Sequence, residues 1–117
     1  MEVVRLETTV RRRAHPHPDH ASFSAQLDAV LADGRRIVLL DDRGWSESPA
    51  AADHLPDDLA FTARTVVGPD EGEDVAGYWG SLARKLDDRG IAAEASALAA
   101  LPHGVVLGWG EGQPGAP

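Results

Sequence analysis

The N-terminal segment alternates between apolar and polar positions. Within residues 3–12, one mainly apolar side holds Val4, Leu6, Thr8 and Val10, and the residues that lie between these four are charged or polar. This period of two is that of a strand with one buried face. The pattern predicts a first strand over residues 3–12.

The spacing of apolar residues then changes to that of a helix, at Phe23, Leu27, Val30 and Leu31. The pair Asp33-Gly34 follows as a typical C-terminal stop, so we expect a short amphipathic helix over residues 23–31. The next apolar run, Ile37–Leu40, is too short for a helix and does not alternate. It predicts a strand that is buried on both faces, at the centre of the sheet.

Residues 41–58 show neither period and are rich in Gly, Ser, Pro, Ala and acidic residues. A loop of this length inside a compact domain is usually functional or mobile. We therefore expect a long loop here.

The second half of the chain predicts four further elements. Phe61, Ala63, Thr65 and Val67 alternate as in a strand, and Val75, Trp79, Leu82 and Leu86 have helical spacing. An alanine-rich helix over residues 91–101 and a short strand at residues 105–107 follow. The stretch 108–117 is rich in Gly and Pro, which predicts a flexible tail.

These elements predict one α+β domain over residues 1–107, in the order β-α-β-β-α-α-β. The simplest architecture with this order is a four-stranded sheet with helices on one face, of the ferredoxin-like kind.

The charge of the chain is strongly acidic and unevenly distributed. The formal net charge is −8, and residues 1–13 hold four Arg and two Glu, or +2, so the remaining residues carry −10. Such a surface repels nucleic acid and anionic membranes and attracts basic proteins.

The chain has no Cys, which excludes disulfides, thiolate metal sites and cysteine nucleophiles. With no apolar leader at the N-terminus, we expect a cytoplasmic protein.

Three imidazoles and a carboxylate lie within six residues, at His15, His17, Asp19 and His20. Neutral imidazole and carboxylate suit Zn²⁺ or another divalent transition metal, so this segment could form a metal site, with His103 as a further ligand. The string resembles the H-x-H-x-D-H signature of the metallo-β-lactamase superfamily, which would imply a metal-dependent hydrolase. It covers six residues, and the later motifs of that family are missing. The alternative is a loop in which Asp19 caps the following helix.

The loop 41–58 is the preferred candidate for partner binding, because an aromatic residue among carboxylates suits a basic protein surface. We assign to this site Asp41, Asp42, Trp45, Glu47, Asp53, Asp57 and Asp58. Two alternatives stay open at this stage. The Asp41-Asp42 pair could bind Mg²⁺ or simply begin a solvated loop, and Trp45 could fold back onto the sheet.

The sequence contains no recognisable catalytic triad or phosphate-binding loop. We therefore expect a small regulatory protein-binding domain, of inhibitor or immunity type, without catalytic activity or cofactor. One alternative is the metal-binding protein or hydrolase. The other is a homodimer that pairs through its first or its final strand.

Overall fold

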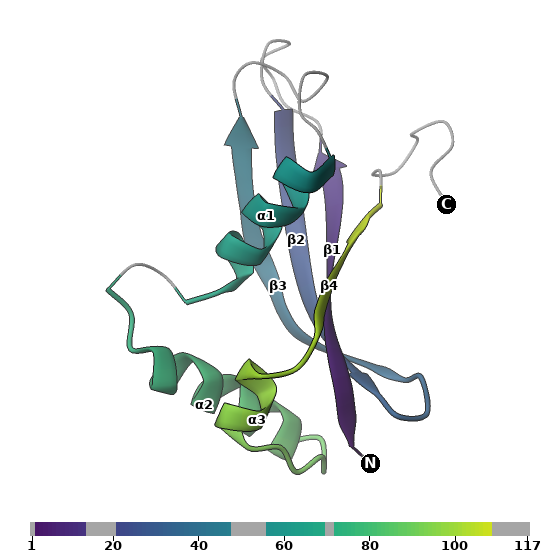
Figure 1. Ribbon diagram of the computed structural model, residues 1–117, viewed down its shortest axis with the longest axis vertical. Coiled ribbons are helices and arrows are strands. Elements are labelled where there is room, and N and C mark those ends of the chain that lie inside the picture. Colours follow the sequence, from purple (N-terminus) through teal and green to yellow (C-terminus); the bar gives the residue numbers. More distant parts are fainter. Residues whose placement is uncertain (1, 14–20, 48–55, 70–71, 109–117) are drawn as a thin grey trace.

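The computed structural model describes residues 2–13, 21–47, 56–69 and 72–108. Three strands come first in the chain, β1 (Val3–Arg13), β2 (Ala21–Leu31) and β3 (Arg36–Glu47). Three helices and a last strand follow, α1 (Pro56–Val67), α2 (Val75–Asp87), α3 (Ala95–Ala99) and β4 (His103–Leu107), as Figure 1 shows.

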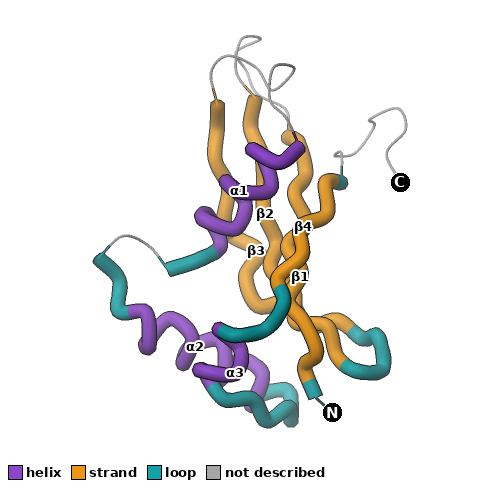
Figure 2. The backbone as a smooth tube through the Cα atoms, viewed as in Figure 1, coloured by secondary structure: helices purple, strands orange, loops and turns teal. Residues whose placement is uncertain are grey.

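The strands form one mixed sheet in the order β3-β2-β1-β4 (Figure 2). β1, β2 and β3 are an antiparallel meander, and β4 returns after the helices to lie parallel to β1. The predicted α+β class is confirmed. The order of elements differs from the predicted one, because three strands precede the helices, so the ferredoxin-like arrangement is not the observed one.

The helix predicted over residues 23–31 is wrong, since this segment is the strand β2. Its side chains in fact alternate strictly: small or polar residues at 22, 24, 26 and 28 separate buried ones at Phe23, Ala25, Leu27 and Ala29. Helical spacing arose only because Val30 and Leu31 are both apolar at the end of the strand. Pairing with β1 and with β3 on its two sides outweighs the helix propensity of Ala and Leu.

The strand predicted at residues 61–67 is wrong too, because this segment belongs to the helix α1. The helix starts with Pro56, a residue that suits the first helical position. Leu59, Ala63 and Val67, four residues apart, form its buried side, and Phe61 on the other side is 71% exposed. The alternation that predicted a strand therefore combined two opposite sides of one helix.

All three helices cover the same face of the sheet. By register, Leu6, Thr8 and Val10 of β1 share this face with the buried residues of β2, and the core there includes side chains from every helix. The main helical contributors are Leu59, Ala63, Val67, Tyr78, Leu82, Leu86 and Leu98. The hydroxyl of Tyr78 donates a hydrogen bond to the carbonyl of Val67 and so ties α2 to the end of α1.

The other predicted strands and helices are present in the structure, and the predicted tail, apart from Gly108, lies outside the described residues. The first strand, the helix over Val75–Asp87 and the last strand are present, and the alanine-rich helix is shorter than expected, at Ala95–Ala99. Ile37–Leu40 is part of the strand β3, but the predicted central position with both faces buried is wrong, because β3 lies at the edge of the sheet and Val38 is 44% exposed. Within the described part of the chain, no helix is long and apolar enough to cross a membrane.

Candidate functional site

The first part of the predicted loop is an edge strand. β3 runs on through Asp41, Asp42 and Trp45 to Glu47, so the loop prediction is wrong for residues 41–47. It is also wrong for the last residues, since α1 begins at Pro56. The reason is that Ser22–Ala25 of β2 pairs with this part of the chain, which its own composition does not reveal.

Two register shifts interrupt the pairing of β3 with β2. Ala25 pairs with Arg43 and Leu27 pairs with Leu40, so the single residue Gln26 stands opposite both Asp41 and Asp42. A second shift follows directly, where consecutive residues of β2 pair with Leu40 and Val38. Two residues opposite one is the pattern of a β-bulge, which bends and twists an edge strand and disrupts its ladder.

The bulge brings two neighbouring carboxylates to the surface. Asp41 and Asp42 are both exposed, and the side chain of Asp42 is 80% exposed. Its Oδ1 lies 3.8 Å from Nε of Arg43, at the outer limit of an ion pair. Arg43 also donates a hydrogen bond of 3.2 Å to the carbonyl of Val66, which fixes the strand next to α1.

Trp45 packs against the sheet. Its ring stacks on that of Phe23, with centroids 5.1 Å apart and an angle of 24° between the planes. The half-buried indole contacts both core clusters. Of the two interpretations that the sequence allowed for Trp45, packing against the sheet accounts for most of its surface.

The other predicted partner-binding residues are only partly placed. The backbone of Glu47 ends β3, and the backbones of Asp57 and Asp58 lie in the first turn of α1, while the side chains of these three residues are outside the described structure. Asp53 lies outside the described residues altogether. Asp41, Asp42 and Trp45 are therefore the residues of this set that the structure brings together.

A hollow of about 330 Å³ lies between β3 and the end of α2. Nζ of Lys85 donates a hydrogen bond of 2.7 Å to the carbonyl of Leu39 and so joins helix and edge strand. Asp41 lines the hollow on the strand side, and Asp88 and Arg89 line it on the helix side. The pentapeptide Leu-Asp-Asp-Arg-Gly occurs at 40–44 and again at 86–90, and residues of both copies meet here.

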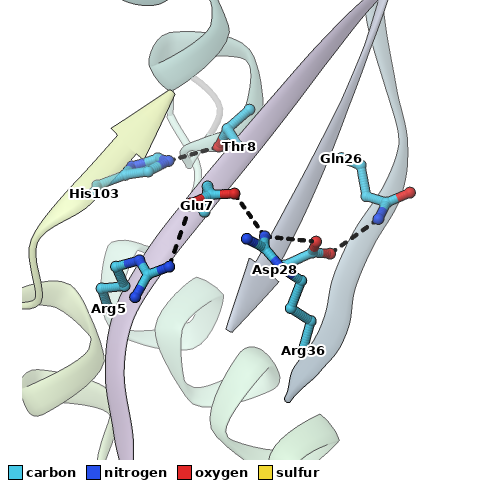
Figure 3. A network of polar contacts seen from close by, with 7 residues as sticks. All are labelled: Arg5, Glu7, Thr8, Gln26, Asp28, Arg36 and His103. Carbon is cyan, nitrogen blue, oxygen red and sulfur yellow. Dashed lines mark hydrogen bonds and ion pairs between the residues drawn. The ribbon is translucent and has the colours of Figure 1, made fainter. Parts of the chain in front are cut away.

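The face of the sheet away from the helices carries a polar network (Figure 3). Nη1 of Arg36 lies 2.6 Å from Oε1 of Glu7 and 3.7 Å from Oδ2 of Asp28, and Gln26 donates a hydrogen bond to Oδ1 of Asp28. The side chain of Asp28 is only 6% exposed. The hydrogen bond with Glu7 raises the pKa of Arg36 above its ordinary value. The network links β1, β2 and β3, which indicates a role in holding the meander together.

His103 begins β4 and lies against β1. Its Nε2 is 2.6 Å from Oγ1 of Thr8, a residue that is fully buried. Burial of the ring lowers the pKa of His103, and the positive charge of Arg64 lowers it further. Both effects favour the neutral imidazole, whose hydrogen bond with Thr8 joins β4 to β1.

The predicted metal ligands His15, His17, Asp19 and His20 lie outside the described residues. Within the described ranges, no three His, Asp or Glu side chains are grouped so that they could hold a metal ion. The site therefore stays a prediction, and the position of His103 is explained by its contact with Thr8.

The sequence pattern did not lead us to predict structural roles for Asp28 and Lys85. The alternation of β2 contained a signal for Asp28, because a charged residue in a half-buried strand needs a partner across the sheet. The hydrogen bond of Lys85 joins positions 46 residues apart in the sequence, so no local pattern predicts it.

Comparison of the chain with protein-family models, with curated proteins and with solved structures finds no match.

Proposed function

We propose that this chain is a protein-binding or regulatory domain of inhibitor or immunity type, without catalytic activity, which docks on a basic partner protein through the edge of β3. The observation that carries the proposal is the exposed pair Asp41 and Asp42, raised by a bulge on an edge strand. Bulges often lie where a sheet presents side chains to a ligand.

The charge of the whole chain supports the choice of partner. With a formal net charge of −8, the molecule creates a negative potential that accelerates its encounter with a positive surface. Complementary charges at the rim of an interface increase the rate of association and orient the partners. A basic protein is therefore the partner class that this edge suits.

The carboxylates stand on a strand that is fixed at several points. Arg43 is bonded to the end of α1, Lys85 bonds to the carbonyl of Leu39, and Trp45 stacks on Phe23. A partner would meet a preorganised surface and lose little entropy in ordering it. Trp45 serves in this proposal mainly to hold the strand in place.

The proposal includes a cytoplasmic location, because a chain without cysteine does not depend on an oxidising compartment for its stability.

The test compares two double variants of equal net charge. Asp41→Lys/Asp42→Lys and Asp87→Lys/Glu94→Lys each add four positive charges, from −8 to −4, but Asp87 and Glu94 are exposed beside a separate hollow. A partner is first captured from the source cells with the unmodified chain and purified. Association rates are then measured by surface plasmon resonance at several salt concentrations.

We expect the variant at β3 to slow association by tenfold or more, and the control variant to slow it much less. The rate for the unmodified chain should fall as salt is added, since salt screens charges beyond about 10 Å at 0.1 M. Equal slowing by both variants would mean that net charge alone, and not the position of Asp41 and Asp42, controls the rate of association. Unchanged binding by the variant at β3 would exclude this edge as the interface.

A further inference from the structure

The two edges of the sheet differ in how they are protected. β3 carries two bulges, the exposed Asp41 and Asp42, and the contact with Lys85. Bulges and charges of this kind prevent an edge strand from pairing with another chain. β4, the opposite edge, has no such protection in the part of the chain that the structure describes, because Gly104–Leu107 contains no charge and its register with β1 is regular.

The hydrogen bonds of β4 show which of its backbone groups face outward. The carbonyl of Pro102 accepts from Leu6, and the N–H of Gly108 donates to Val10, both at 2.8 Å. Because backbone groups alternate along a strand, the even-numbered residues of β4 point to β1. The N–H and C=O groups of His103, Val105 and Leu107 therefore point away from the sheet, at the margin where β4 lies in Figure 1.

This set of outward groups is symmetric about Val105. In an antiparallel pair of two β4 strands related by a two-fold axis, Val105 stands opposite its own copy and His103 stands opposite Leu107. Each of these pairs joins residues whose backbone groups point outward, so six hydrogen bonds form without any change of register. A self-complementary patch of this kind is what a two-fold interface requires.

The side chains complement each other in the same register. Gly104 stands opposite Val106 of the second copy, in a pair that lies between the hydrogen-bonded ones, where the Cα atoms approach most closely. Val106 is 44% exposed on the face away from the helices, and among the described residues, chain neighbours aside, no atom lies within 4 Å of the place where a Cβ of Gly104 would lie. The valine of one copy therefore fits over the glycine of the other.

We infer that two copies of this chain associate through antiparallel pairing of β4, which joins their sheets into one continuous sheet of eight strands. The first strand, the other candidate for such pairing, cannot serve, since β1 lies inside the sheet between β2 and β4. Self-pairing through β3 would bring the carboxylates of both copies together, which like-charge repulsion opposes. The inference does not depend on the proposed function, which concerns the opposite edge.

The test is sedimentation velocity of the full chain over a range of concentrations. Val106→Asp places a carboxylate at the interface, and Val38→Asp is its matched control, since both valines are 44% exposed on edge strands. We expect the unmodified chain and Val38→Asp to dimerise alike, and Val106→Asp to raise the dissociation constant of the dimer at least tenfold. Circular dichroism shows whether each variant keeps the fold.

Amide hydrogen exchange followed by NMR gives a second readout. The amide of Val105 should become protected as the concentration rises, whereas that of Val106, which is bonded to β1, should be protected throughout. A chain that stays monomeric at several hundred micromolar would overturn the inference, as would a dimer that Val38→Asp disrupts and Val106→Asp does not. A monomer that dimerises only after removal of residues 109–117 would also overturn it for the full chain and would assign the edge to that segment.

Discussion

At the scale of single residues, Gly44 allows the close pairing of β3 with β2 beyond the bulge. A Cβ at this position would lie 2.6 Å from the carbonyl oxygen of Phe23, a backbone atom that cannot move without opening the pair. Gly104 in β4, on the other edge, has open space where a Cβ would lie. Both glycines therefore lie in edge strands, but a side chain would be crowded at Gly44 and would have free space at Gly104.

We expect Gly44→Ala to lower the free energy of unfolding by about 1–3 kcal/mol, the usual cost of a side chain forced into a packed place. Gly104→Ala should change it by less than about 1 kcal/mol, with a gain expected because glycine weakens a strand. Urea unfolding at micromolar concentration measures both. Equal losses in the two variants would mean that the short contact at Gly44 is not maintained.

His103 gives the second prediction at this scale. Burial and the charge of Arg64 lower its pKa in the folded protein, whereas in the unfolded chain it should have the ordinary value of about 6.5. Between these two values the unfolded state binds more protons, so stability rises with pH. The contribution is complete above about pH 7 and is lost as the pH falls through the lowered pKa.

The measurement is the free energy of unfolding in urea between pH 5 and pH 7.5. As the pH falls through this window, we expect the free energy of unfolding of the unmodified chain to decrease, and that of His103→Gln to decrease much less. His15→Gln, a change at a histidine outside the described residues, serves as the control for the loss of one imidazole. A slope that His103→Gln leaves unchanged would assign the effect to other groups.

At the scale of elements, α1 offers a direct test of helix against strand for residues 56–67. In the helix, Leu59 is 2% exposed and Phe61 is 71% exposed, while the predicted strand would have made Phe61 part of the core. We expect Leu59→Ala to cost about 2–5 kcal/mol. Phe61→Ser should change stability by no more than about 0.5 kcal/mol, as for other exposed positions. Thermal and urea unfolding distinguish the two; a large loss in Phe61→Ser would contradict the helix.

Elements with one clear period were predictable from the sequence, and elements that depend on distant partners were not. Residues 75–87 have helical spacing, and the helix α2 buries Leu82 and Leu86 as predicted. Even there, the third buried residue is Tyr78 and not the predicted Val75, which is 57% exposed. The predicted central position of residues 37–40 was wrong, because a run of four apolar residues suggests burial but does not show which strands lie beside it.

The candidate site was predictable in part. Asp41, Asp42 and Trp45 were selected for their residue types, and the structure places them on one strand. The bulge that exposes the carboxylates depends on the register with β2, and register is a property of pairs of segments. Composition alone therefore led us to select these residues as candidates, but it predicted a loop where the structure has a strand.

At the scale of the whole molecule, β4 completes the sheet. Leu6 pairs with His103, and Val105 and Leu107 pack against the cluster formed by Val10, Phe23, Leu59 and Ala63. Without this strand, β1 would have an open edge and the cluster would lose part of its cover.

We expect the chain without residues 103–117 to lose cooperative unfolding in urea. The chain without residues 109–117 keeps β4 and is the matched control, so the difference between the two truncations measures the contribution of this strand. Similar unfolding midpoints for both truncations would show that the meander and the helices form a stable unit without β4.

The parallel pairing of the first and last strands also has a consequence for synthesis. Leu6 and His103 are paired neighbours, yet 55 residues lie between the end of β3 at Glu47 and the start of β4 at His103. A ribosome that adds about 5–20 residues per second needs about 3–11 s for that stretch. Until β4 has been made, the edge of β1 has no partner strand, so it is open to pairing with another chain during this interval.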